Sequence, residues 1–384
     1  MNNHLFKLTT LSLLCFSINA HAAGPGIVAK VDKQLWQAPI NTPDSFDKAS
    51  RATILIYALA LQDRQTLSDT DMKAAFKIKT VNRTSVTKWI NKELALSLLN
   101  YQNSAKSCTS DDWTCVGTLN STADLLTQAD TLPTKIPPTL SAWRDNLQQF
   151  TRAYTAEQLR LAALFPNVSS EIDTFNANEW NGDNFTDRQF LLSFDDGPSK
   201  AQGDTDNVLT MLSANNKNAV FFVLGENLQN RLNKTDTNTL ATLYKNQCIA
   251  SHGWAHQSHA KWANWQDSIK RTQTLLTNSL PKQNTATTGS FSHLFRPPYG
   301  QRKADSSTFF QQQGLQVALW NLDSQDWHKQ VNSNDVLNRM LTLMLIKRHG
   351  VLLFHDIHPK ANAALPMLFN EVGNAVEWKD CHSL

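Results

Sequence analysis

Two adjacent carboxylates end the most informative stretch of this sequence. Asp195 and Asp196 follow the apolar run Phe190–Phe194 and precede Gly197 and Pro198. Side chains alternate between the two faces of a strand, but the Gly-Pro pair breaks the strand, so both carboxylates are able to project from its end into one cleft. Two ionised carboxylates in one cleft repel each other unless a cation or a proton relieves them. The stretch therefore favours a metal site, although an isolated Asp-Asp-Gly-Pro is more often a surface turn.

Four further motifs with chemically active residues follow in order, each after or at the end of an apolar run. They read His-Gly-Trp-Ala-His at 252–256, Arg-Pro-Pro-Tyr-Gly at 296–300, Asp-Ser-Gln-Asp-Trp at 323–327 and Leu-Leu-Phe-His-Asp at 352–356. His252 and His256 with one carboxylate supply two imidazoles and one oxygen, which leaves coordination positions open for water and substrate. Such a histidine pair alone is often accidental, so the ordered set carries the prediction.

Two other metal-dependent classes are disfavoured. A zinc protease with this histidine spacing has Glu after the first histidine, whereas position 253 is Gly. A non-haem iron oxygenase also uses two histidines and a carboxylate. Its chemistry does not call for a second adjacent Asp, an Arg-Pro-Pro-Tyr turn or an Asp-Trp pair.

The five motifs together resemble those of the NodB-like polysaccharide deacetylases, carbohydrate esterase family 4, over about residues 187 to 380. The resemblance implies a metal-dependent hydrolase that removes N-acetyl groups from N-acetylglucosamine units of a polysaccharide, with chitin oligomers and peptidoglycan as the leading substrates. Some members cleave O-acetyl esters from xylan with the same residues, so an esterase is an alternative. A glycan-binding protein with a decayed site is another, but every expected catalytic position is filled.

The resemblance also implies a role for each residue of the first two motifs. Asp196, His252 and His256 are the expected metal ligands, and Asp195 is the expected general base. The physics agrees with this division, because one carboxylate lowers the charge of the metal while its uncoordinated neighbour accepts a proton from water. We expect zinc, with cobalt, nickel or manganese as alternatives for a mixed nitrogen and oxygen site.

The later motifs supply the remaining expected catalytic groups. Arg296 pairs with Asp195 and keeps it ionised. The two prolines after Arg296 stiffen a turn in which the backbone N–H of Tyr299 serves as an oxyanion donor. His355 is the expected general acid, because an amine leaves poorly as an anion, and Asp326 orients His355 and raises its pKa.

Four residues are expected to contact substrate. Trp327 and Leu353 are expected to wall the pocket for the acetyl methyl group, and Tyr299 to contact the substrate through its backbone N–H. Trp254 is a candidate stacking platform for a sugar. The side chains of Trp327, Leu353 and Trp254 also suit core packing. One departure from the family is Gly253, which stands where Ser or Thr follows the first metal histidine. That hydroxyl braces the loop, so either metal affinity is lower here or the bracing comes from elsewhere.

The elements that must position these motifs alternate between strand and helix from residue 189 onward. The expected strands are 190–194, 219–224, 248–251, 293–296, 316–322 and 351–354, and the expected helices are 205–212, 239–245, 267–280, 306–313, 334–347 and 361–372. This alternation predicts a parallel sheet with the motifs at the carboxyl ends of its strands. The resemblance implies an α/β fold, a distorted (β/α) barrel of about seven strands; the spacing alone fits an open sheet equally well.

The chain before the motifs divides into three parts. Residues 1–22 read as a cleaved signal peptide, with Lys7, an apolar core and an Ala-His-Ala site. Residues 23–165 are expected to be a mainly helical N-terminal region, because apolar residues recur at helical spacing in 85–99 and 141–164. Residues 166–188 are polar and read as a linker to a polysaccharide deacetylase domain at 189–384.

Export is supported by the cysteines. Removal of the signal leaves Cys108, Cys115, Cys248 and Cys381, an even number as in oxidising compartments. Of three possible connectivities we favour Cys108 with Cys115 and Cys248 with Cys381. We therefore expect a secreted or periplasmic protein that is not inserted in a membrane, since no second long apolar segment exists.

The composition limits the classes of partner. The formal net charge is only +3, and no basic stripe with interleaved aromatic residues occurs, so nucleic acid is excluded as a partner. An acetylated polysaccharide or oligosaccharide fits a mildly charged chain with 11 tryptophans. We expect a monomer.

Overall fold

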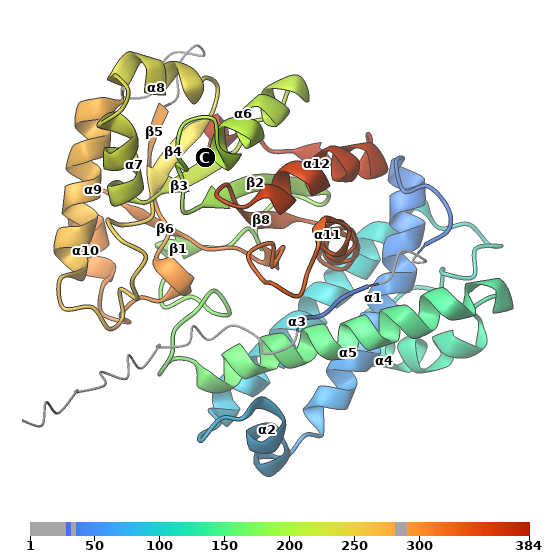
Figure 1. Ribbon diagram of the computed structural model, residues 1–384. Coiled ribbons are helices and arrows are strands. Elements are labelled where there is room, and N and C mark those ends of the chain that lie inside the picture. Colours follow the sequence, from blue (N-terminus) through green and yellow to red (C-terminus); the bar gives the residue numbers. More distant parts are fainter. Residues whose placement is uncertain (1–27, 32–35, 281–289) are drawn as a thin grey trace, which may run out of the picture.

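The computed structural model describes residues 28–31, 36–280 and 290–384, so the predicted signal peptide lies outside the described residues. Figure 1 shows a group of long helices from the N-terminal part packed beside a sheet that carries its own helices. No helix within the described ranges is long and apolar enough to cross a membrane.

The N-terminal region is helical, as predicted. Its helices are α1 (Pro43–Gln65), α2 (Asp69–Phe76), α3 (Arg83–Ser104), α4 (Thr122–Thr131) and α5 (Ser141–Leu164), with short 3-10 turns at Ala105–Ser107, Leu132–Thr134 and Pro138–Leu140. Helix α1 begins where Thr42 and Ser45 form a capping box and Pro43 occupies the first turn. Such a cap satisfies backbone N–H groups that have no partner inside the helix.

The second part is a parallel sheet. Its strands are β1 (Glu179–Trp180), β2 (Gln189–Asp195), β3 (Val220–Val223), β4 (Cys248–Ser251), β5 (Ser290–Phe295), β6 (Gln316–Ala318), β7 (Leu322–Asp323), β8 (Gly350–His355) and β9 (Glu377–Trp378). They lie in the order β1-β6-β5-β4-β3-β2-β8-β7, with β9 beside β2. The expected strands are present, except that the expected strand 316–322 forms two short strands, β6 beside β5 and β7 beside β8. The prediction of a distorted (β/α) barrel after a helical region is confirmed.

Helices connect successive strands along the chain and cover the sheet (Figure 1). They are α6 (Asp204–Ala214), α7 (Gly225–Leu232), α8 (Thr237–Leu243), α9 (Trp265–Ser279), α10 (Ser307–Gln312), α11 (Ser333–Lys347) and α12 (Pro359–Val372), with 3-10 turns at Pro298–Gly300 and Cys381–Ser383. Three elements were not expected. Strand β1 lies in the segment interpreted as a linker and pairs with β6. Strand β9, which pairs with β2, and helix α7 are the other two.

Strand β2 stands at the centre of the architecture. Every residue of Phe190–Asp195 is buried, and the strand is hydrogen-bonded to β3 on one side and β8 on the other. Phe194 stacks on Phe221 and contacts Phe354 from those neighbours. A strand buried on both faces is the apolar run expected of a parallel sheet.

The helical region and the barrel share one hydrophobic core, which runs from α1 and α5 to α11 and β2. Buried ion pairs also cross between them: Arg348 with Asp47, Lys347 with Glu93, and Arg339 with Glu157. A buried ion pair is weak evidence for stability, but its two side chains must keep a defined position relative to each other. The N-terminal helices are therefore held in one position against the barrel.

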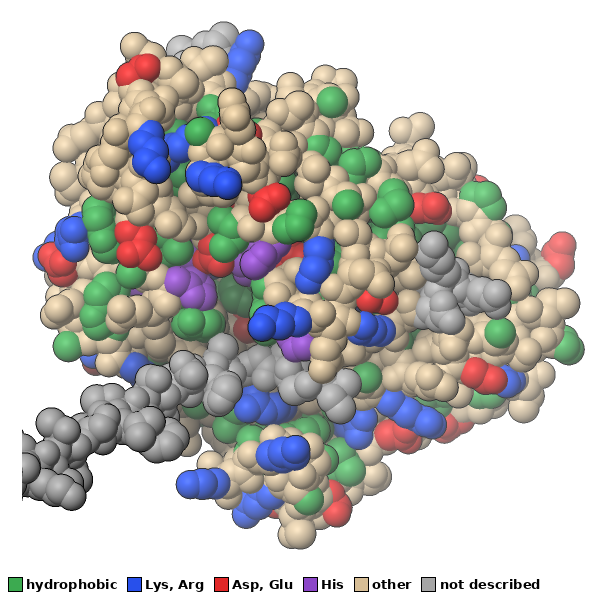
Figure 2. All heavy atoms as spheres, in the orientation of Figure 1, with side chains coloured by type: hydrophobic (Ala, Val, Ile, Leu, Met, Phe, Trp, Pro, Cys, Tyr) green, Lys and Arg blue, Asp and Glu red, His purple; other side chains and the backbone are tan. Residues whose placement is uncertain are grey.

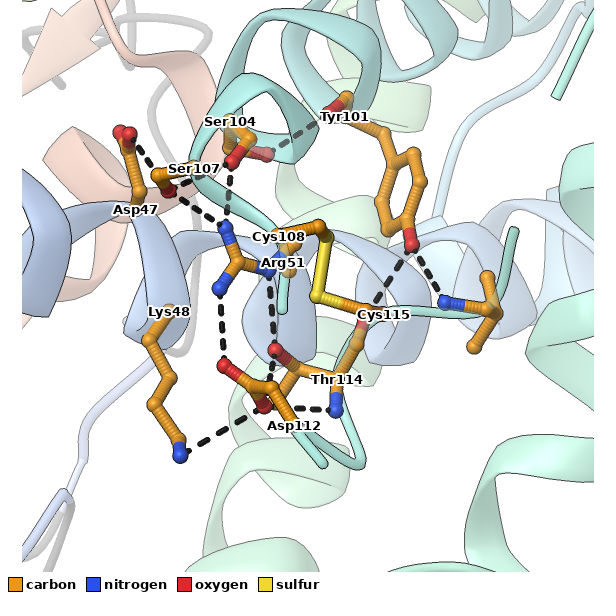
Figure 3. The surroundings of a disulfide bond; sticks show 11 residues. Asp47, Lys48, Arg51, Tyr101, Ser104, Ser107, Cys108, Asp112, Thr114 and Cys115 are labelled. Carbon is orange, nitrogen blue, oxygen red and sulfur yellow. Dashed lines mark hydrogen bonds and ion pairs between the residues drawn. A yellow bond between two sulfur atoms is a disulfide. The ribbon is translucent and has the colours of Figure 1, made fainter. Parts of the chain in front are cut away.

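Both predicted disulfides are present. Cys108 pairs with Cys115, and Cys248 pairs with Cys381, so the chain end is tied to β4. Figure 3 shows how the first disulfide loop is held by Arg51 of α1, whose guanidinium reaches Thr114 and Asp112. The loop is thereby attached to the helical core.

Candidate active site

The carboxyl ends of the central strands meet at a cavity of about 220 Å³. Figure 2 shows histidine side chains gathered around a hollow on the face that it displays. Parallel strands present their carboxyl ends at one edge, so residues that follow β2, β4, β5, β7 and β8 come together there. The cavity holds the predicted ligands and the expected base and acid.

Asp196, His252 and His256 form a compact group. The Oδ1 of Asp196 lies 3.4 Å from Nε2 of His252 and 3.5 Å from Nε2 of His256. Nδ1 of His252 lies 2.8 Å from the carbonyl oxygen of Arg296, so the opposite ring nitrogen faces Asp196. The backbone of Asp196 has a φ of 78° and is held by Asn227, whose amide donates to its carbonyl at 2.7 Å.

This group fits a divalent metal. The Oδ1 of Asp196 is buried and has no hydrogen-bond partner. Burial raises the pKa of Asp196, but His252 and His256 outweigh it and hold that pKa well below its usual range. Burial lowers the pKa of His256. An ionised carboxylate with neutral imidazole is the protonation state that metal binding requires.

Asp195 points into the same cavity but is engaged differently. Its Oδ1 accepts a hydrogen bond from Nη1 of Arg296 at 2.8 Å, while its Oδ2 lies 3.8 Å from Nε2 of His252. Arg296 is fully buried, and its other donors reach the carbonyl oxygens of Ala318 and Leu319. The guanidinium is therefore fixed, and it holds one oxygen of Asp195 while the other faces the histidines.

His355, the last residue of β8, and Asp326, in the turn after β7, form a buried pair. Oδ1 of Asp326 lies 2.7 Å from Nδ1 of His355, and Oδ2 accepts the backbone N–H of His355 at 2.9 Å. Burial opposes a charge on the imidazole, but Asp326 outweighs it and raises the pKa of His355 to about 10. A carboxylate that binds one ring nitrogen leaves Nε2 free to carry a proton into the cavity.

The remaining predicted residues separate into two groups. Tyr299, Trp327 and Leu353 line the cavity, and the ring of Tyr299 packs edge-on against His256 with centroids 4.3 Å apart. Tyr299 has a φ of 60°, which places it at a sharp turn. Trp254 is not among the described residues that line the cavity; its ring lies beneath the guanidinium of Arg271 at 3.8 Å.

The hydroxyl that Gly253 lacks is supplied by helix α9. Oγ of Ser268 accepts the backbone N–H of Trp254 at 2.7 Å and lies 3.3 Å from Nε2 of His259. Gly253 has a φ of +83°, and a Cβ there would lie 2.7 Å from the ring of His259. The ring of His259 thus occupies the space of a side chain at 253, and Ser268 braces the loop from outside the motif.

Some cavity residues were missed by the sequence interpretation. Glu157, Gln158 and Leu161 of α5 and Ser170 and Glu171 of the following segment line the same cavity. Nothing in the helical periodicity of α5 indicated a site. Asp323 and Gln325 also line it, and their place inside the fourth motif was a signal that could have found them.

Comparison with known proteins identifies the family. Residues 182–318 match the family model described as polysaccharide deacetylase. A peptidoglycan-N-acetylglucosamine deacetylase of Listeria monocytogenes is 32% identical over 184 residues, which are 47% of this chain and 35% of that protein. Chitin deacetylase 1 of Saccharomyces cerevisiae is 33% identical over 174 residues, which are 44% of this chain and 52% of that protein.

A solved family 4 carbohydrate esterase from Streptomyces lividans, in complex with acetate, is 25% identical with a TM-score of 0.41, covering 50% of this chain and 93% of that one. This chain thus spans about a third to a half of the length of the two curated relatives above. The matched segment includes the carboxylate, histidine and arginine motifs of the cavity. Residues 182–318, which contain these motifs, therefore match the polysaccharide deacetylase family.

Proposed function

We propose that this protein is a metal-dependent hydrolase that removes N-acetyl groups from N-acetylglucosamine units of a polysaccharide. The observation that carries the proposal is the convergence on one cavity of three units: the Asp196 group with its two histidines, the Asp195–Arg296 pair and the His355–Asp326 pair. Amide hydrolysis needs an activated water, a base and an acid, and these units supply one each.

Asp196, His252 and His256 are the proposed metal ligands, because the ligand atoms all lie within 4.8 Å of one another. Two nitrogens and one oxygen suit zinc, with cobalt, nickel or manganese as alternatives. A bound divalent ion would polarise the acetyl carbonyl and lower the pKa of water to about 7.

Asp195 is the proposed general base. Arg296 binds its Oδ1 at 2.8 Å and leaves Oδ2 to accept a proton from the attacking water. The buried guanidinium places a positive charge directly against this carboxylate. The guanidinium donates hydrogen bonds to Ser193, to Asp195 and to the carbonyl oxygens of Ala318 and Leu319. These bonds prevent it from turning toward the substrate.

His355 is the proposed general acid. With Asp326 on Nδ1, the imidazolium is stable at neutral pH and donates its other proton to the departing nitrogen. The backbone N–H of Tyr299 is the proposed oxyanion donor. Trp327, which is 38% exposed, and the buried Leu353 are the proposed walls for the acetyl methyl group.

The substrate is proposed as an N-acetylated glycan, chitin oligomer or peptidoglycan, because relatives carry the names of peptidoglycan and chitin deacetylases. A relative named bifunctional xylanase/xylan deacetylase, 28% identical over 140 residues, supports O-deacetylation as the second candidate. We further propose a secreted or periplasmic monomer, and the two disulfides support export.

A panel of acetylated glycans tests the proposal. Metal-loaded protein is incubated with chitin oligomers, peptidoglycan and acetylated xylan, and both released acetate and new free amines are measured. We expect acetate and amine in equal amounts from an N-acetylated glycan. Acetate without amine would instead establish the esterase, and no acetate from any glycan would reject both.

A further inference from the structure

The wall of the cavity away from the metal ligands is acidic and comes partly from outside the barrel. Among the described residues that line the cavity there is no Lys or Arg, whereas Glu157, Glu171 and Asp323 add to the carboxylates of the catalytic group. Glu157 is neutralised by Arg339, with 2.8 Å between Oε2 and Nη2. Within the described residues, Glu171 and Asp323 form no such ion pair, since the nearby Arg302 pairs with Glu179 and Arg339 with Glu157. This wall is therefore rich in hydrogen-bond acceptors.

Glu171 is held in the wall by the turn that carries Tyr299. Gly300 has a φ of +66°, and a Cβ there would lie 2.8 Å from the backbone nitrogen of Glu171. Only glycine permits this approach. Nη1 of Arg302 donates to the carbonyl oxygens of Ser170 at 2.7 Å and of Gly300 at 2.9 Å, and so ties the two segments together.

Gln325 presents an unsatisfied acceptor beside Asp323. The backbone N–H of Gln325 donates to Oδ1 of Asp323 at 2.8 Å, and its side-chain Nε2 donates to Oδ2 at 3.0 Å. These bonds fix the orientation of the amide, so Oε1 is the atom left over. Gln325 is only 5% exposed, and its Oε1 is buried without a hydrogen-bond partner. Such an acceptor in a cavity wall calls for a donor from a ligand.

The electrostatics of the two carboxyl groups point to a cation. Burial, and then the charge of Asp323, raise the pKa of Glu171 to about 8. Burial likewise raises the pKa of Asp323. Two half-buried carboxyl groups that repel each other gain from a positive group beside them. An ammonium group has three N–H donors, and it satisfies carboxylates and an amide oxygen together.

We propose that Glu171, Asp323 and Gln325 form a subsite for the protonated amino group of a glucosamine unit next to the N-acetylglucosamine unit in the catalytic cavity. This inference rests on the proposed function. A partly deacetylated glycan carries such a group, because the proposed reaction creates one amine for each acetate that it releases. The subsite selects amine-bearing neighbours and disfavours glycans with anionic substituents at the same place.

Defined disaccharides test the selectivity. The kcat/KM for acetate release is measured on di-N-acetylchitobiose and on both mono-acetylated isomers, in which the free amine lies on one side or the other. We expect at least one mono-acetylated isomer to exceed the diacetylated compound by about tenfold, the factor that one charge-assisted hydrogen bond supplies. Activity on all three disaccharides without preference would overturn the subsite and leave the proposed function standing.

Variants of nearly the same shape test which residues cause the preference for a mono-acetylated disaccharide. Glu171→Gln and Asp323→Asn each replace one carboxyl group by an amide at nearly constant shape, and each should lower the selectivity ratio about tenfold. Glu226→Gln removes a charge at an exposed position on α7 outside the cavity and should leave the ratio unchanged. A ratio that survives in both cavity variants, or falls equally in Glu226→Gln, would overturn the assignment.

Binding of a fully deacetylated ligand gives a readout that needs no turnover. Calorimetric titration of the metal-loaded protein with chitobiose lacking both acetyl groups should show weaker binding, by about tenfold in Kd, for Glu171→Gln than for Glu226→Gln. Thermal melting verifies that each variant is folded. If no glycan yields acetate but this difference in Kd holds, the subsite stands without the proposed reaction; equal Kd values would overturn the subsite whatever the activity.

Discussion

Asp326 binds His355 through both of its oxygens, with 2.7 Å to the ring Nδ1 and 2.9 Å to the backbone nitrogen. The carboxylate therefore fixes the tautomer, the ring orientation and the backbone position of one histidine at once. The ring nitrogen opposite Nδ1 is left for the cavity. This relationship makes the acid half of the proposed reaction testable without altering the metal ligands.

The first prediction concerns the leaving group. His355→Ala should damage acetamide cleavage far more than cleavage of an activated aryl acetate, because a phenolate leaves without a proton and an amine does not. Rates of both substrates are compared in wild type and variant. Equal losses on both would place the proton donor elsewhere.

The same pair predicts a pH dependence. Asp326 raises the pKa of His355 to about 10, so the acid form is present below that pH and is lost as the pH rises through it. Amide cleavage should therefore decline on the basic side, and Asp326→Asn should shift that decline to lower pH because the imidazolium loses its partner. The kcat profile on an acetamide measures the shift. A basic limb that stays in place would contradict the pairing.

The second prediction concerns the metal. His256→Ala removes one ligand of the Asp196 group and should abolish tightly bound metal and activity together. His328→Ala is the control, since its ring lies outside this group and accepts a hydrogen bond from Gln330 at 3.2 Å. Elemental analysis of dialysed protein decides between them. A full equivalent of metal in the His256 variant would refute the ligand set.

The third prediction separates ligand from base. Asp195→Asn should keep its metal and lose about 10² to 10⁴ in kcat, since an amide does not accept the proton of water. Asp196→Asn should lose the metal itself. Metal content and kcat are measured for both variants. Comparable metal loss in the two would end the proposed division of labour.

The fourth prediction tests the replaced brace of the metal loop. Gly253→Ser should destabilise the fold by about 1–3 kcal/mol, because φ is positive and His259 occupies the space. Gly314→Ser is a matched control, with a φ of +64° but no atom within 4 Å of the added Cβ, and should cost less. Chemical unfolding measures both. A Gly253→Ser protein as stable as wild type would show that His259 does not fill the place of a side chain at 253.

The fifth prediction compares the two disulfides. Cys248 and Cys381 are 133 residues apart, and Cys108 and Cys115 are 7 apart. Loop entropy makes the longer link worth roughly 5 kcal/mol and the shorter roughly 2 kcal/mol. Replacing each pair by Ser should lower the melting temperature more for the longer link. A larger loss from the shorter link would indicate that the contacts of Arg51 around it depend on the bond.

Much of the candidate site was predictable because its signals are local. The apolar run before Asp195 marks a buried strand, and parallel strands deliver their carboxyl ends to one edge whatever the details of packing. The same rule brings His252, Arg296 and His355 to that edge. The even number of cysteines and the polar loop between Cys108 and Cys115 favoured the two disulfides that the structure contains.

Other features depend on contacts between distant segments and have no local signature. Helical periodicity in α5 predicts a helix but does not say that Glu157 and Gln158 face the cavity, because only the shared core decides which helix face meets the barrel. The hydroxyl of Ser268 takes the place of the Ser or Thr hydroxyl expected at position 253. It does so only because α9 packs beside the metal loop. The contact of Trp254, a candidate stacking platform for a sugar, with Arg271 of α9 likewise has no local signature. The residue types and order thus determine the proposed chemistry, whereas the acidic wall at Glu171 exists only because Gly300 and Arg302 hold a distant segment against the site.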